Sequence, residues 1–173
     1  MRIVISDTSC LIDLRKGGLL TGLLALPYQF AIPLPLFEEE LLDMSARDKN
    51  LLVQAGLEVW DLSGEQVDRS GTIQRQNRAL TINDCFAFVA AADTPQSILL
   101  TGDGPLRRYA AAQAVEVHGV LWAIDEMHAA AILPPQALYR ALVIFDDDPT
   151  VWLPSAEHSR RLQKFRRLSQ QKP

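Results

Sequence analysis

The chain has 173 residues, of which 48% are hydrophobic and 22% charged, and its formal net charge is −4 at pH 7. This length allows one domain with a substantial core and is too short to expect two full domains. No segment reaches the roughly 18 consecutive apolar residues that cross a bilayer, and the acid at position 7 argues against a secretion signal, so we expect a cytoplasmic protein with no membrane span.

Short apolar runs alternate with helical patterns over most of the sequence. The strand-like runs are residues 3–6, 29–33, 56–62, 97–101 and 115–119. The main helical patterns between them are 8–18, 36–44, 63–79, 82–92 and 106–114. Because parallel neighbours need a helical crossover, this alternation predicts parallel pairing. We expect a three-layer α/β/α sandwich around a central parallel sheet of about five strands.

The pattern changes after Met127, and we expect one α/β domain over residues 1–128 and a helical extension over 129–173. Pro154 and Ser155, a candidate N-cap, mark the start of the last predicted helix. Residues 153–173 contain six basic residues and one acid, a net charge of +5, which leaves −9 for the other 152 residues. The basic tail is either a binding segment for RNA or an acidic antitoxin, or simply a solvated helix.

Two aspartates follow strand-like runs. Asp7 comes directly after IVIS, and Asp103 lies two residues beyond the run 97–101. Ligands of parallel α/β sheets bind outside the carboxyl ends of the strands, so we expect both aspartates at that edge. Aspartate is equally favoured at helix N-caps and turns, where its side chain accepts hydrogen bonds from backbone N–H groups.

Glu40 is predicted to lie within an apolar stripe. On a helix over 36–44, Phe37, Leu41 and Met44 share one face, and Glu40 falls inside it. A lone buried carboxylate is costly unless it is paired, protonated or bound to a metal ion. If the helix is rotated, Glu40 lies at a wet margin and Glu39 becomes the candidate.

Asp84 is the only charged side chain of the apolar helix 82–92. Thr81 stands three residues before it, in a pattern that resembles a capping box, and capping is compatible with a further role. If these acids converge, three or four carboxylates supply the oxygen ligands that Mg²⁺ and Mn²⁺ prefer, without any histidine.

Other chemistries have less support in the sequence. The three histidines do not cluster, and Ser9 and Cys10 have no obvious histidine base. No glycine-rich phosphate-binding motif is present. Cys10 and Cys85 lack the spacing of a disulfide or zinc pair and are expected to be buried thiols.

Four segments resemble the PIN-domain family of metal-dependent ribonucleases, which includes VapC-type toxins of toxin–antitoxin pairs. They are IVISDTSCLIDL, IPLPLFEEEL, LTINDCFAFVAA and LLTGDGPLRRYAAAQAVEVHGVLWAIDEM. The resemblance covers about residues 1–128. It maps the acidic quartet of the family onto Asp7, Glu40, Asp84 and Asp103, which are the acids selected above, and Glu40 is matched through its Glu-Leu pair.

The resemblance implies an endoribonuclease that hydrolyses RNA phosphodiester bonds with Mg²⁺ or Mn²⁺ held by this quartet. It implies auxiliary roles for Thr8, Ser9 and Thr101, and it makes an antitoxin and a second copy of the chain expected partners. Arg107 is a candidate for contacting substrate phosphate, and a salt bridge to a neighbouring helix is its alternative role.

Two other functions remain open at this point. One is a catalytically inactive PIN-like module that binds nucleic acid or protein. The other is an aspartate-nucleophile phosphohydrolase, in which Ser9 would stand where such enzymes usually carry a second aspartate.

Overall fold

The five strand-like runs form one parallel sheet in the order β3-β2-β1-β4-β5. The computed structural model of the protein describes residues 1–42 and 44–170. Its strands are β1 (Ile3–Ser6), β2 (Gln29–Pro33), β3 (Leu57–Trp60), β4 (Ile98–Leu100) and β5 (Glu116–His118). The predicted parallel sheet of five strands is confirmed.

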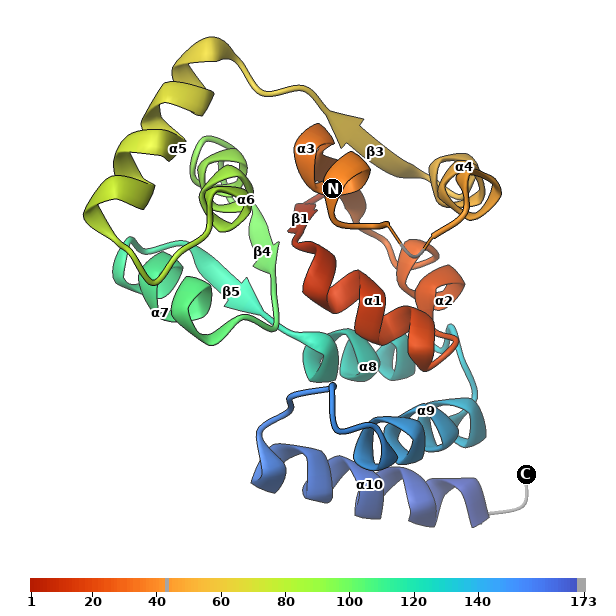
Figure 1. Ribbon diagram of the computed structural model, residues 1–173. Helices are drawn as coiled ribbons and strands as arrows, with labels where there is room; N and C mark the ends of the chain where they lie inside the picture. The colour runs from red at the N-terminus through yellow and green to blue at the C-terminus, as the bar shows by residue number, and fades with distance from the viewer. Residues whose placement is uncertain (43, 171–173) are drawn as a thin grey trace.

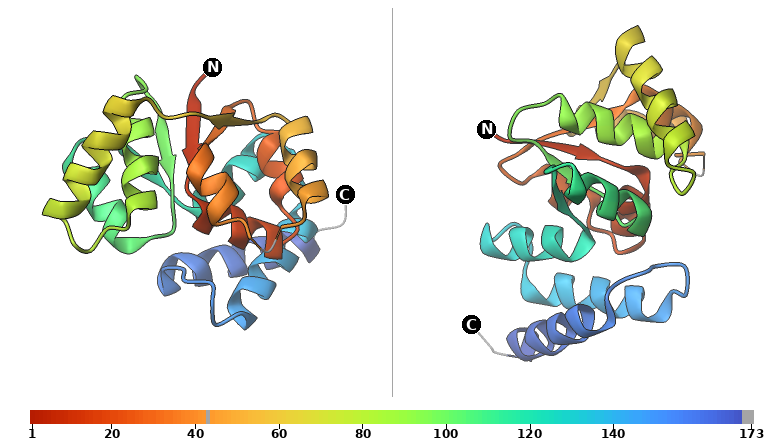
Figure 2. Two further views of the ribbon diagram at one scale, coloured as in Figure 1. Left: turned by 45° about the horizontal axis from the view of Figure 1, so that its top comes forward. Right: turned by 90° about the vertical axis from the view of Figure 1, so that its left-hand side faces the viewer.

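Helices cover both faces of this sheet. They are α1 (Thr8–Lys16), α2 (Leu20–Leu24), α3 (Leu34–Glu39), α4 (Ala46–Gln54), α5 (Gly64–Gln76), α6 (Ile82–Ala92), α7 (Gly104–Ala112), α8 (Val120–Ala129), α9 (Pro135–Asp147) and α10 (Ser155–Gln170). α6 contacts β1, β2 and β4, with α5 outside it, while α1, α2 and α8 contact one another on the opposite face (Figures 1 and 2). The three-layer α/β/α sandwich is confirmed.

The strand order reverses between β1 and β4. The chain adds β2 and β3 on one side of β1, and β4 and β5 on the other. Ser6 pairs with Leu100 at the ends of the two central strands, and the Asp7 N–H donates to the Leu100 carbonyl at 2.9 Å. The residues that follow β1 and β4 therefore lie side by side at the switch point, the usual ligand position in such sheets.

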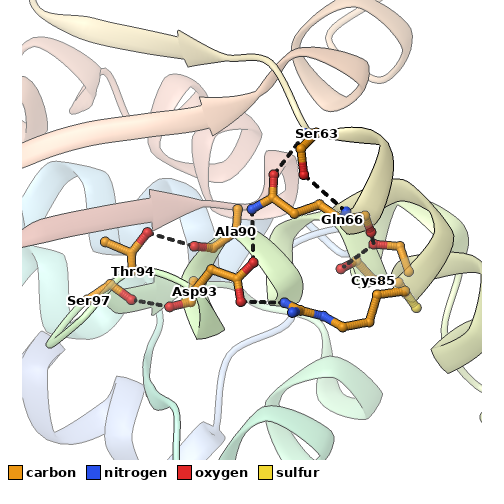
Figure 3. Close-up of polar contacts among 10 residues, drawn as sticks. Ser63, Gln66, Cys85, Ala90, Asp93, Thr94 and Ser97 are labelled. Carbon is orange, nitrogen blue, oxygen red and sulfur yellow. Dashed lines mark hydrogen bonds and ion pairs between the residues drawn. The ribbon is translucent and has the colours of Figure 1, made fainter.

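α5 is fastened to α6 by polar contacts (Figure 3). Ser63 and Gln66 form a capping box at the start of α5. The Gln66 amide and Arg69 both donate to Asp93, at 3.0 and 2.5 Å, just after α6 ends. These contacts fix the outer helix against the helix that carries Asp84.

α9 and α10 pack against each other, and α9 also contacts α1 and α8 (Figure 1). Arg161 of α10 donates to Asp125 of α8 at 2.9 and 2.6 Å, so part of the basic tail pairs with an acid of the domain. Arg166 and Arg167 are exposed, and Lys172 lies outside the described residues. Ser155 is the first residue of α10, and the carbonyl of Pro154 accepts from His158 N–H.

Gly17, at the end of α1, allows the close approach of α9. A Cβ at this position would come within 2.7 Å of the Phe145 ring and 3.1 Å of Ala141. We therefore expect Gly17→Ala to lower the free energy of unfolding by about 1–3 kcal/mol through overpacking. Chemical denaturation measures this, and Gly64→Ala, where a Cβ meets no atom within 4 Å, is the control. Equal stability of the two variants would contradict the expectation.

Cys10 and Cys85 are buried free thiols, as predicted. Within residues 1–42 and 44–170, no helix has both the length and the apolar character to cross a membrane.

Candidate functional site

Asp7 is a buried carboxylate, with 4% of its surface exposed, directly after β1. It occupies the N-cap of α1, yet its side chain makes no capping hydrogen bond. Instead Oδ2 accepts from Ser9 Oγ at 2.7 Å and from Thr101 Oγ1 at 2.8 Å. The capping role considered for Asp7 is therefore not the role its side chain takes.

Glu40 lies at the carboxyl end of α3, which stops at Glu39 rather than continuing to residue 44. The prediction of a helix over 36–44 is wrong, and residue 43 lies outside the described residues. Lys49 Nζ donates to the carbonyls of Phe37 and Glu38, at 2.7 and 3.4 Å. If the helix continued, these two carbonyls would accept from the N–H groups of residues 41 and 42.

Glu40 is half-buried, while Glu38 and Glu39 are exposed. Thr8 Oγ1 donates to Glu40 Oε2, and Asn83 Nδ2 donates to Oε1 at 2.9 Å. Of the two alternatives, Glu40 is therefore the acid that the fold turns toward Asp7.

Asp84 and Asp103 both cap helices. Asp84 Oδ2 accepts from Thr81 N–H at 2.7 Å while its own N–H donates to Thr81 Oγ1, which completes the predicted capping box. Asp103 is the N-cap of α7, where Oδ1 accepts from Leu106 N–H at 2.7 Å. Each cap engages one carboxylate oxygen in these bonds, so capping leaves both groups with capacity for a further ligand.

The three hydroxyls expected to assist the acids link Asp7 to Glu40 and to the loop that carries Asp103. Thr101 Oγ1 donates to Asp7 and accepts from Asp103 N–H at 3.0 Å. Ser9 Oγ likewise donates to Asp7 and accepts from Gly102 N–H at 3.0 Å. Thr8 Oγ1 lies 3.4 Å from Asp7 Oδ1 and also contacts Glu40. The hydroxyls thus connect the end of β1, α3 and the loop after β4.

The charges of these carboxylates also affect the pKa values of their neighbours. The pKa of Asp7 is raised from 3.8 to about 6, chiefly by burial and also by the charges of Asp84 and Glu40, while the hydrogen bonds from Ser9 and Thr101 oppose the rise. Burial likewise raises the pKa of Asp84, with contributions from Asp103 and Glu40. None of the ion pairs between described residues includes one of these four acids. The four acids therefore carry negative charge that no ion pair between described residues balances.

The donor set suits a hard divalent cation, although its spacing is wide. Carboxylates and hydroxyls are oxygen donors, and a cation would neutralise the charge that burial makes costly on Asp7. In the arrangement described for residues 1–42 and 44–170, no three His, Cys, Asp or Glu side chains are close enough to hold one ion. The chemistry of the residues fits Mg²⁺ or Mn²⁺, and their full convergence requires the side chains to approach one another.

Asn83 is a site residue that the sequence did not single out. Its Nδ2 holds Glu40, and its Oδ1 is buried without a hydrogen-bond partner among the described residues. A buried amide oxygen normally finds a donor or ligand, so this atom has capacity for one. Its only signal in the sequence is a polar residue in the first turn of an otherwise apolar helix.

Arg107 holds the loop after β4 in place. Its Nη1 donates to the Thr101 carbonyl at 2.9 Å, and a Cβ at position 119 would approach that nitrogen to 3.1 Å, so Gly119 leaves room for it. The alternative of a salt bridge to a neighbouring helix has no support among the described ion pairs. Contact of Arg107 with substrate stays a prediction.

A large cleft opens beside these residues. Its volume is about 1190 Å³, and its lining includes Ser9, Thr101, Asp103 and Arg107 on one side and Trp152 on the other. The cleft therefore runs from the loop after β4 to the connection between α9 and α10.

The protein is a three-layer α/β protein with acidic side chains near the switch point of its parallel sheet. A family model described as a PIN domain matches residues 3–167, so the chain belongs to the PIN-domain family. Its fold is therefore nuclease-like. PIN domains are generally nucleases, and they typically use divalent metals. A comparison with curated proteins found no match.

Proposed function

We propose that the protein is a Mg²⁺- or Mn²⁺-dependent endoribonuclease that hydrolyses RNA phosphodiester bonds. The observation that carries this proposal is the buried carboxylate of Asp7, which three hydroxyls connect to Glu40 and to the Asp103 loop and which no ion pair between described residues includes. Asp7, Glu40, Asp84 and Asp103 would hold the metal. When bound, the ion supplies positive charge that polarises the phosphate and makes a water molecule more acidic.

The chain's own residues prepare this site. Ser9 and Thr101 orient Asp7, and Thr8 and Asn83 orient Glu40, so the donors are set before substrate arrives. Asp84 and Asp103 also cap the starts of α6 and α7, which fixes the position of each carboxylate. Arg107 fixes the backbone of the loop that carries Asp103.

Cleavage of a mixed-sequence single-stranded RNA tests the proposal. We expect cleavage in Mg²⁺ or Mn²⁺, none in EDTA, and a loss of at least about a hundredfold in rate with Asp103→Asn, because several kcal/mol of charge stabilisation are removed. Asp61→Asn, an exposed acid outside the site, is the matched control. Cleavage that persists in EDTA, or that Asp103→Asn leaves unchanged, would refute the proposal.

The second candidate is a catalytically inactive module that binds nucleic acid or protein. The wide spacing of the acids among the described residues favours it. In the same assay, this candidate predicts RNA binding with no cleavage in either metal.

A toxin role, an antitoxin partner, a homodimer and a cytoplasmic location extend the main proposal. Expression of the chain in a bacterial host should then arrest growth, and Asp7→Asn should relieve the arrest. Equal growth arrest by both chains would show that toxicity does not depend on Asp7. Size-exclusion chromatography tests the dimer.

A further inference from the structure

The connection between α9 and α10 displays Trp152, whose side chain is among the most exposed large apolar groups described in the chain. Its exposed fraction is 85%. No aromatic pair between described residues includes it. Burying a large aromatic ring is strongly favourable, so a tryptophan left open to solvent beside a cleft is available to stack on a ligand that enters the cleft.

The backbone around Trp152 is anchored, which means that its exposure is not due to a loose loop. Lys16 of α1 pairs with Asp148 at 3.1 Å and donates to Thr150 Oγ1 at 2.5 Å. Asp148 also accepts from the Thr150 N–H at 2.8 Å. Val151, which follows Thr150, is buried. The polar contacts of Asp148 and Thr150 and the burial of Val151 therefore fix the backbone that precedes Trp152.

The cleft that Trp152 borders shares residues with the candidate site. Its lining includes Ser9, Thr101 and Asp103 as well as Trp122 and Trp152. In Figure 1 the connection between α9 and α10 rises toward the start of α8, which brings the two regions together. One face of Trp122 is already covered, since His118 stacks on it with ring centroids 4.6 Å apart. Trp152 is the aromatic ring of this cleft without such a partner.

We propose that Trp152 is a stacking platform for a nucleobase of single-stranded RNA, next to the nucleotide whose phosphate reaches the carboxylates. This inference rests on the proposed function. A nucleotide carries a planar apolar base and a phosphate on one unit, which matches a cleft with an aromatic ring at one end and the candidate site at the other. Every base has a face that stacks on an aromatic side chain, so the platform tolerates any sequence.

The charge of the domain opposes nonspecific RNA binding, so binding there needs a contact that is not electrostatic. Residues 1–152 carry a net charge of −9, which repels RNA phosphates. Stacking on Trp152 supplies affinity without positive charge, and its contribution to binding is therefore independent of salt.

Binding of a fluorescein-labelled single-stranded RNA decamer, followed by anisotropy in EDTA, tests the platform. We expect Trp152→Ala to weaken binding about 5- to 150-fold with an unchanged salt dependence, and Trp152→Phe to restore most of the affinity. Val67→Ala, which trims another exposed apolar side chain on α5, is the control and should bind as the unmodified chain does. A duplex RNA of the same sequence should show no dependence on Trp152.

Unchanged decamer binding in Trp152→Ala overturns the inference, as does absent binding by the unmodified chain in both EDTA and Mg²⁺. So does an effect of Trp152→Ala on oligomeric state alone, which would make the cleft a surface for a second copy. The proposed nuclease activity fails separately. Decamer binding that depends on Trp152 without cleavage in Mg²⁺ or Mn²⁺ supports the platform and refutes the nuclease, whereas cleavage with binding independent of Trp152 does the reverse.

Discussion

We expect Asp7→Asn to reduce RNA cleavage by at least about a hundredfold and, at the same time, to stabilise the folded protein at pH 8. The first effect follows because the central carboxylate of the proposed metal site is lost. The second follows because an ionised carboxylate with 4% exposure is costly to bury, and asparagine has nearly the same shape without the charge. Replacing an aspartate that has only a structural role would not combine a loss of cleavage with a gain in stability.

The sign of the stability effect follows from proton binding. The pKa of Asp7 is raised from 3.8 to about 6 in the folded chain, so the folded state holds the proton more tightly than the unfolded state. The Asp7 contribution to stability is therefore highest below about pH 4 and falls as the pH rises through about 6. The gain from Asp7→Asn should grow over this window to at most about 3 kcal/mol at pH 8.

Urea denaturation of both chains at pH 4, 6 and 8 measures this gain. The difference between the two chains isolates Asp7 from other titrating groups such as Asp13, whose pKa burial also raises to about 6. Asp61→Asn controls for the loss of a negative charge at an exposed position. A destabilised Asp7→Asn at pH 8 would contradict the expected cost of the buried charge.

The order of the elements was accessible from the sequence because strand and helix periodicities are local properties. All five strands lie where the apolar runs predicted them, and the acids after β1 and β4 reach the same edge because parallel strands impose it. The capping box of Thr81 and Asp84 was equally local, since it depends on two residues three apart.

The features that sequence missed depend on contacts between distant segments. α3 ends at Glu39, and Lys49 of α4 donates to two of its last carbonyls, while α2 and α4 are short helices that were not predicted. Asn83 contacts Glu40 across 43 positions in the chain. Lys16 of α1 pairs with Asp148 at the end of α9, beside the cleft, and no pattern within either segment indicates that contact.

The thermal midpoint of the unmodified chain should rise in Mg²⁺ or Mn²⁺ at pH 8. A ligand that binds only the folded state stabilises it by about 2.7 kcal/mol at a hundredfold excess over its Kd. For a chain of this size, that corresponds to a shift of about 5–10 °C. Differential scanning fluorimetry with and without EDTA measures the shift, and Asp61→Asn should retain it.

The same metal-induced shift should shrink as the pH falls through about 6, because a proton on Asp7 and a metal ion compete for one carboxylate. Asp7→Asn removes both the competing proton and the donor, so its midpoint should respond little to metal at any pH. Asp84→Asn should weaken the response at pH 8 as well, since its carboxylate is electrostatically coupled to Asp7 and Glu40. A shift that is equal at pH 5 and pH 8, or unchanged by Asp7→Asn, would place the bound metal elsewhere on the chain.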